Sequence, residues 1–284
     1  MMRFRPKKIP DVRKIKATIV FVAGLLSGFG SALTGIGAQA TYSPSLIWML
    51  GYAPEKAAGV GLRLGFWTAL IAVFSAIFLT PNFQMGLIFE AFLLFVGATI
   101  GAILSSPVKK ILAKDGSRTL GKVGGIVVAL LTLFLTVRQN PFGGTYGVGG
   151  NHYLLLLGFS LLSGLMAASF SITPAFLLVP ALYFFVSMKG AEAIILSLMV
   201  TVFASLLPLL GYRAKELTEG RFSESGLFGG VLGAVFGGII LAHLLKVNSA
   251  WSLVLFSLVA MFLSSRELML MQNQTVKSEK TPEE

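Results

Sequence analysis

The chain has 284 residues, of which 55% are hydrophobic and only 12% are charged, and its mean hydropathy is +0.82. Soluble domains carry about 25% charged residues. The composition therefore excludes an ordinary soluble fold. It predicts an all-α polytopic membrane protein, because the long apolar runs suit membrane helices rather than the strands of a membrane barrel. The absence of cysteine excludes disulfides and thiolate metal sites, and the sequence predicts neither a metal nor another cofactor.

The first 16 residues, MMRFRPKKIPDVRKIK, form a dense basic cluster before the first apolar run. Such a cluster is typical of an uncleaved cytoplasmic N-terminus, and it also suits contact with anionic lipid. The net charge of +11 therefore indicates membrane topology rather than nucleic-acid binding. The other end, residues 269–284, is polar and is predicted to be a disordered cytoplasmic tail.

Between these ends the chain divides into two halves of five apolar segments each. A Gly-rich linker, residues 139–151, separates the first half, residues 17–138, from the second, residues 152–268. The second segment of each half is too short for a comfortable crossing and is predicted to be re-entrant or to cross only half of the membrane. The segments are 17–34, 38–50, 57–79, 84–104 and 121–138, then 152–171, 174–187, 191–212, 225–246 and 250–268.

The two halves resemble one another at a constant offset of 136 residues. AGLLSGFGSALTGIGAQATYSPSL, residues 23–46, aligns with FSLLSGLMAASFSITPAFLLVPAL, residues 159–182. The alignment pairs Leu25-Leu26-Ser27-Gly28 with Leu161-Leu162-Ser163-Gly164 and Pro44 with Pro180, and further along the chain it pairs Gly97 with Gly233 and Gly101 with Gly237. These matches predict an internal duplication.

The predicted repeats are inverted in the membrane. In each half the first two segments leave and return on one side, so the half makes an odd number of crossings. The loop at 105–122 has five basic residues and one Asp and is predicted to be cytoplasmic, whereas 80–85 and 139–151 are predicted to be external. Both termini are then cytoplasmic, in a multi-pass protein of the prokaryotic inner membrane.

Each repeat contains one helix break, at Gly35-Ile36-Gly37 and at Ser171-Ile172-Thr173-Pro174. Non-helical backbone at membrane depth is tolerated only where protein or a watery cavity satisfies it. New short helices are predicted to begin near Ala38 and Pro174, and their unpaired amides would form an anion pocket where the breaks meet near the midplane. The residues predicted to bind substrate are Thr34, Gly35, Gly37, Ala38, Gln39, Thr41, Ser43, Ser169, Ser171 and Thr173.

Two charged residues in apolar segments extend this hypothesis. Arg63 lies about two turns inside its segment, where an arginine costs at least ~2.5 kcal/mol and usually faces a cavity or a partner. Its planar fork suits an oxyanion, so it is predicted to bind the substrate directly; snorkelling to the membrane edge is the alternative. Glu90 is a candidate for proton coupling, with a snorkelling residue at the helix end as the alternative.

The first break is similar to the G-x-x-x-G-x-x-G-I-G-G-G-x-x-x-x-P motif of the TauE/SafE sulfite and organosulfonate transporters, the TSUP family. The second copy resembles its degenerate partner, and the likeness in length, duplication and motif placement covers nearly the whole chain. Ala38 and Gln39 stand where the family has glycines. The resemblance implies movement of small sulfur-containing anions or organic acids through the inner membrane.

These observations predict a secondary transporter of a small anion that works by alternating access. An anion channel using the same pocket is the alternative. An enzyme is not expected, because the spans contain no His-Glu-x-x-His, Ser/His pair or clustered carboxylates. The expected partners are the anion and the lipid bilayer, without nucleic acid; proton coupling and a homodimer are both compatible with the sequence.

Overall fold

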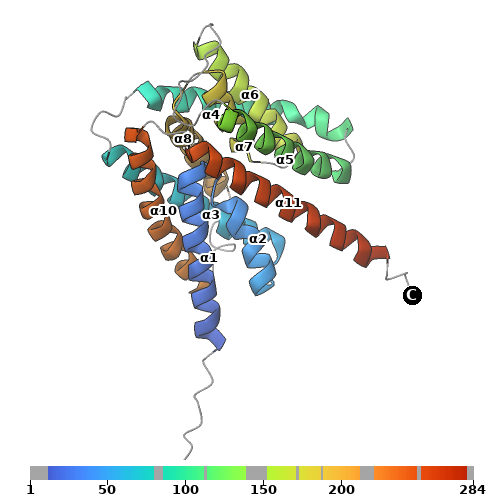
Figure 1. The fold of residues 1–284 in the computed structure, drawn as a ribbon. Helices are drawn as coiled ribbons and strands as arrows, with labels where there is room; N and C mark the ends of the chain where they lie inside the picture. The colour runs from blue at the N-terminus through green and yellow to red at the C-terminus, as the bar shows by residue number, and fades with distance from the viewer. Residues whose placement is uncertain are drawn as a thin grey trace, which may run out of the picture.

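The computed structural model is an all-helical bundle (Figure 1). It describes residues 12–79, 86–111, 114–138, 152–170, 173–186, 188–211, 221–247 and 251–279. The first half contains α1 (Val12–Thr34), α2 (Gln39–Leu50), α3 (Pro54–Phe78), α4 (Gly86–Ile111) and α5 (Lys114–Arg138). The second half contains α6 (His152–Phe170), α7 (Ala175–Phe184), α8 (Gly190–Gly211), α10 (Arg221–Val247) and α11 (Trp251–Glu279).

The helices have the length and surface of a membrane protein. In the part of the chain that the structure describes, four are long and apolar enough to cross a membrane: Lys16–Thr34, Lys56–Phe78, Ile88–Ser105 and Glu224–Leu244. Large apolar side chains lie exposed around the bundle, among them Phe78 at 90% and Leu154 at 66%. Lipid rather than water is the solvent that suits such a surface. The fold class predicted from the sequence, a polytopic α-helical membrane protein, is confirmed.

Two boundaries differ from those predicted. The loop expected at 105–122 is mostly helical, because α4 continues to Ile111 and α5 already begins at Lys114. The tail expected at 269–284 is helical as far as Glu279. The extension of α11 is rich in good helix formers and has no proline, whereas α4 and α5 extend into 105–122 despite Pro107, Gly116 and Gly121.

The two repeats exchange helices across the bundle. The first helix of each repeat packs along the fourth helix of the other, so α1 lies on α10 and α6 lies on α4. The third helices, α3 and α8, contact one another, as do the fifth helices, α5 and α11. This reciprocal pattern is what a pseudo-two-fold axis relating two copies of one unit produces, and it supports the predicted duplication.

Glycine residues allow α1 and α10 to approach one another closely. A Cβ atom on Gly24 or Gly28 of α1 would overlap the carbonyl of Gly226 or Gly230 of α10, respectively. Small residues at such positions let helix backbones approach, which drives helix association in membranes. The residue numbers rise together along both helices, so α1 and α10 run parallel.

The contacts correct the alignment of the fourth helices by one turn. Gly101 of α4 faces the Leu161 carbonyl of α6, and the residue in the same place on α10 is Gly233, which faces the Leu25 carbonyl of α1. The constant offset had paired Gly101 with Gly237. A four-residue shift leaves a Gly-x-x-x-Gly face almost unchanged, so the sequence pattern alone does not fix this register.

The glycine contacts fix the relative directions of several helices. Gly230 of α10 faces Leu64 of α3, and Gly238 faces Ser75, so α3 runs parallel to α10 and therefore to α1. The glycine contacts of α4 place it parallel to α6, whereas the connection between α3 and α4, residues 80–85, lies outside the described residues. The opposite directions of the equivalent helices α1 and α6 stay a prediction, which requires α4 to run back after α3.

The helices at the centre are α7 and α8. Residues Ala193–Val200 of α8 are all buried, and in α7 only Leu177 and Phe184 are even partly exposed. Their apolar side chains form the main core with buried residues of α3 and α11. Helix α8, the third helix of the second repeat, is thus surrounded by protein. Residues that contact α8 therefore lie near the middle of the bundle.

We expect Gly28→Ala to weaken the packing of α1 on α10. The added methyl group overlaps backbone of Gly230, which has no flexible end that can move aside. Overpacking of this kind costs about 1–3 kcal/mol, which the thermal unfolding midpoint in detergent measures. Gly30→Ala is the matched control on the same helix, because its methyl group meets nothing within 4 Å. Equal midpoints for the two variants would contradict the interface.

Single cysteines at Ala53 and Lys189 test the inversion. These residues directly precede α3 and α8, occupy equivalent places in the two repeats, and are both exposed. We expect a membrane-impermeant maleimide added to intact cells to label Lys189→Cys and not Ala53→Cys, since the N-terminus is predicted to be cytoplasmic. The chain has no cysteine of its own, so no background arises. Labelling of both variants from one side would mean that the repeats are parallel.

Candidate functional site

The first break interrupts the chain over residues 35–38, between α1 and α2. Gly35 has a φ of +73°, in the left-handed region that a side chain disfavours. The Thr34 hydroxyl donates to the Gly30 carbonyl at 2.7 Å and accepts from the Ile36 amide at 3.3 Å. Thr34 is therefore engaged in closing α1, and its hydroxyl supports the turn rather than facing a ligand.

The break is attached to α8 of the other repeat. The Ser197 hydroxyl donates to the Gly35 carbonyl at 3.2 Å. One turn further along α8, the methyl carbon of Thr201 would lie 3.1 Å from a Cβ atom on Gly37. Both glycines of the first break thus lie against α8, one of the two central helices, and a side chain on either would be in tight contact with it.

On its other side the break and α2 lie against α3. A Cβ atom on Gly61 would overlap the Ser43 hydroxyl, and one on Gly65 would lie 3.3 Å from Oε1 of Gln39. Gly61 and Gly65 are the repeat equivalents of Ser197 and Thr201, since each pair is separated by 136 residues. The first break therefore sits between equivalent positions of α3 and α8, beside the pseudo-two-fold axis.

The start of α2 offers unpaired hydrogen-bonding groups at this place. The amides of Gly37, Ala38 and Gln39 have no acceptor among the described residues, and Ala38, the N-cap, provides no side-chain cap. Such amides, with the helix dipole, carry partial positive charge. The Oε1 atom of Gln39 is also buried without a hydrogen-bond partner in the described part of the chain. Amides at a helix start of this kind suit an anion.

The second break lies between α6 and α7 and is described only from Thr173 onward. The Thr173 carbonyl accepts from the Phe176 amide at 3.1 Å, and its Oγ1 atom is buried without a partner among the described residues. Pro174 begins the turn into α7, as predicted. The side chain of Ser169 and the whole of Ser171 lie outside the described residues, so their roles stay predictions.

Arg63 is on a different face of α3 from the break. Residues along a helix are rotated by about 100° each, so Arg63 lies roughly opposite Gly61 and Gly65, which contact α2. It shares its face with Trp67 and Phe74, which are 41% and 62% exposed. The structure therefore does not bring Arg63 together with the start of α2, and this placement argues against the direct contact that the sequence predicted.

The remaining predicted residues are spread over three places. Ser43 lies against α3, as described above. Thr41 donates to the Ala38 carbonyl at 3.0 Å and lines a groove on the opposite side of α2, toward α11. Glu90 is half-buried near the start of α4, and its role in proton coupling stays a prediction.

Ser197 and Thr201 are contact residues that the sequence analysis missed. They lie in a long apolar helix, where hydroxyl residues are common and carry no motif. The repeat offset could have found them, because it projects Gly61 and Gly65 of the first repeat onto these positions. The interaction itself joins residues 162 positions apart and could not be inferred from local pattern.

Comparison with known proteins gives one informative similarity. The chain is 25% identical over 239 residues to a protein of Xylella fastidiosa (strain 9a5c) named "Probable membrane transporter protein". The match covers 80% of this chain and 85% of that protein, so it extends across both repeats. No protein-family model matches the chain.

Gly35→Ala tests whether the break depends on α8. The left-handed φ costs an alanine about 1–2 kcal/mol, and its methyl group would also lie 3.1 Å from Cβ of Ser197. Ser197→Gly removes that contact, so we expect the two substitutions to be coupled by about 0.5–3 kcal/mol in a double-mutant cycle of unfolding.

The control for this cycle is Gly51→Ala. Gly51 also has a left-handed φ, +67°, but a Cβ atom there meets nothing within 4 Å. Gly51→Ala should lower the stability by the conformational cost of the left-handed φ and show no coupling to Ser197→Gly. Additive effects of Gly35→Ala and Ser197→Gly would mean that the break does not rest on α8.

Proposed function

We propose that the chain is a secondary transporter of a small anion and that the anion binds at the start of α2. The observation that carries the proposal is the position of the first break. Its unpaired amides lie between equivalent residues of α3 and α8, the third helices of two inverted repeats. Broken helices at the interface of inverted repeats are the usual substrate sites of secondary transporters.

Alternating access follows from the exchanged packing. The first, third, fourth and fifth helices of each repeat lie against the opposite repeat. A rocking motion of the pair α1 and α10 past the pair α4 and α6 would change which side of the break is exposed. The start of α2 then faces one side of the membrane in one state and the other side in the second state. The name of the Xylella fastidiosa relative supports a transporter but says nothing of what is carried.

The chemistry of the site favours an oxyanion. Three neighbouring amides can donate to the oxygens of one sulfite, sulfonate or carboxylate group, and the helix dipole favours negative charge there. The side-chain amide of Gln39, which lies over Gly65, provides one more donor and one acceptor at the edge of this group. Sulfite or a small organosulfonate is the substrate class that the resemblance to TauE/SafE transporters supports.

Flux through proteoliposomes tests the function directly. The purified protein should give saturable uptake of radiolabelled sulfite or taurine, and unlabelled substrate inside the vesicles should stimulate uptake by counterflow. Unitary currents without counterflow would replace the transporter with a channel. Absence of both activities across sulfite, sulfonates and simple carboxylates would overturn the proposal of anion transport.

Three substitutions locate the site. We expect Gly37→Val to abolish uptake, because its side chain meets Thr201 and covers the free amides. Gln39→Ala should weaken substrate binding about three- to tenfold through loss of one hydrogen bond. Arg63→Gln should leave affinity unchanged, because Arg63 lies on the other face of α3. Calorimetric titration of the purified variants measures all three affinities.

Arg63 is the informative control, because the sequence predicts the opposite result for it. A loss of affinity in Arg63→Gln with none in Gln39→Ala would move the anion to the outer face of α3. Each variant is compared at equal thermal stability in detergent, so that a folding defect is not mistaken for lost binding.

A further inference from the structure

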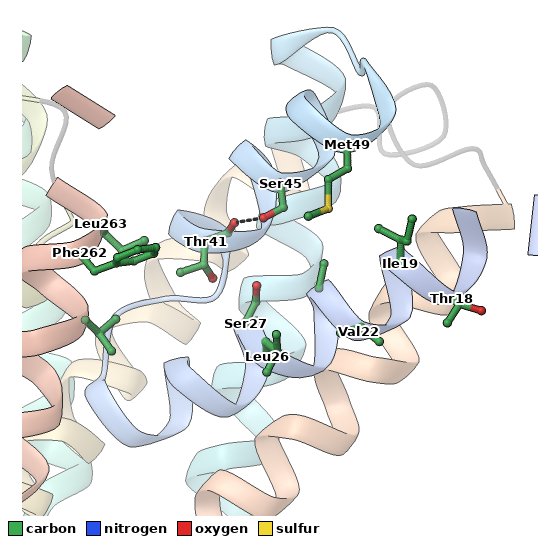
Figure 2. A pocket seen from close by; sticks show the side chains of 12 residues that line it. Thr18, Ile19, Val22, Leu26, Ser27, Thr41, Ser45, Met49, Phe262 and Leu263 are labelled. Atoms are coloured by element: carbon green, nitrogen blue, oxygen red, sulfur yellow. Dashed lines mark hydrogen bonds between the residues drawn. The ribbon is translucent and has the colours of Figure 1, made fainter. Parts of the chain in front are cut away.

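A groove runs along the outside of the bundle between α1, α2 and α11 (Figure 2). Its cavity volume is about 490 Å³. At one end Met49 of α2 lies near Thr18 and Ile19 of α1, and at the other Phe262 and Leu263 of α11 lie near Thr41. The groove therefore follows the first half of α1 from its N-terminal end toward the middle of the bundle.

The lining of the groove is apolar, and the polar atoms on its α2 wall are already bonded. The hydroxyl of Thr41 donates to the Ala38 carbonyl, and that of Ser45 donates to the Thr41 carbonyl at 2.8 Å. The rim consists of exposed apolar side chains, including Leu26 at 62% and Phe262 at 65%. Such a surface binds hydrocarbon rather than a small polar anion, which separates the groove from the site at the start of α2.

The dimensions fit one acyl chain. From Thr18 to Ser27 the groove follows ten residues of α1, whose nine steps of helix rise span about 13 Å of helix axis. Half of the hydrocarbon thickness of a bilayer is about 15 Å. The groove therefore has about the length of one leaflet, which suits a single acyl chain.

The charge at the N-terminal end of the groove specifies the headgroup. The first turns of α1 carry three basic residues, Arg13, Lys14 and Lys16. The last of them, Lys16, is exposed and lies just before Thr18 on α1. Basic residues next to a membrane span attract anionic lipid, by about 1 kcal/mol each. An anionic headgroup at this end places its acyl chain along the groove.

We propose that the groove is a binding site for an anionic phospholipid of the bilayer, held by one acyl chain between α1 and α2 and by its headgroup at the basic end of α1. The lipid lies against the outer side of α2, whose inner side carries the free amides. It therefore braces the short helix that the proposed transport function depends on, although lipid binding itself can be measured whether or not transport is found.

Native mass spectrometry tests the site. The full chain in detergent is titrated with phosphatidylglycerol and with phosphatidylcholine of identical acyl chains. We expect tighter binding of the anionic lipid. Lys14→Gln with Lys16→Gln should lower the affinity for phosphatidylglycerol about five- to twenty-five-fold and leave phosphatidylcholine unchanged.

A substitution that fills the groove with a side chain provides a second test of lipid binding. Val22→Trp places a ring where the acyl chain lies and should weaken phosphatidylglycerol binding at least about tenfold. Val127→Trp on α5 is the matched control, since Val22 and Val127 are exposed to 45% and 49%, and it should bind as the unsubstituted chain does. Weaker phosphatidylglycerol binding by Val22→Trp supports the site, provided that its thermal unfolding midpoint, measured without added lipid, equals that of the unsubstituted chain.

The position of the acyl chain is read from a phosphatidylglycerol with a diazirine in its tail. Photo-adducts should map to residues 18–27 and 41–49. Equal affinity for the two lipids, undiminished binding in Val22→Trp, or adducts spread evenly over the outer helices would each overturn the proposal and leave the groove as ordinary lipid-facing surface.

Discussion

A broken helix inside a membrane exposes backbone groups that lipid cannot hydrogen-bond, and this constraint explains where the first break lies. Its carbonyl at Gly35 is bonded by a hydroxyl of the opposite repeat, and its amide at Ile36 is bonded by Thr34. The amides that remain lie between α3 and α8, away from lipid. The proposed function gives those amides an acceptor, since a bound anion completes the hydrogen bonding that the protein leaves unfinished.

The break can lie between α3 and α8 because the first helix of each repeat packs against the opposite repeat. Glycine at the contacts of α1 with α10, and of α4 with α6, brings backbones so close that even a methyl group would overlap a carbonyl. This packing holds the ends of α1 and α6 against the other repeat. It also leaves α3 and α8 in contact with one another, with the short helix α2 against α3 and the short helix α7 against α8.

The two repeats have diverged around this shared frame. On α3, Gly61 and Gly65 leave room for Ser43 and Gln39 to approach, whereas their equivalents on α8 are hydroxyl residues that contact the break itself. The first break thus has different neighbours on its two sides. An asymmetric site suits a substrate without two-fold symmetry, and the groove outside α2 adds a lipid-facing side that the proposed phospholipid covers.

The sequence by itself determined the fold class, the duplication, the two breaks and all ten helices to within a few residues over most of their ends. These features depend on local pattern, namely apolar runs and the residues that interrupt them. Only the tertiary structure decided that Arg63 faces away from the break and that Ser197 bonds Gly35. It also decided that the fourth helices are related by a register one turn from the obvious alignment. The physical reason is that a side chain's partner depends on how each helix is rotated about its axis and which helix lies beside it, and a pattern that repeats every four residues looks the same before and after such a shift.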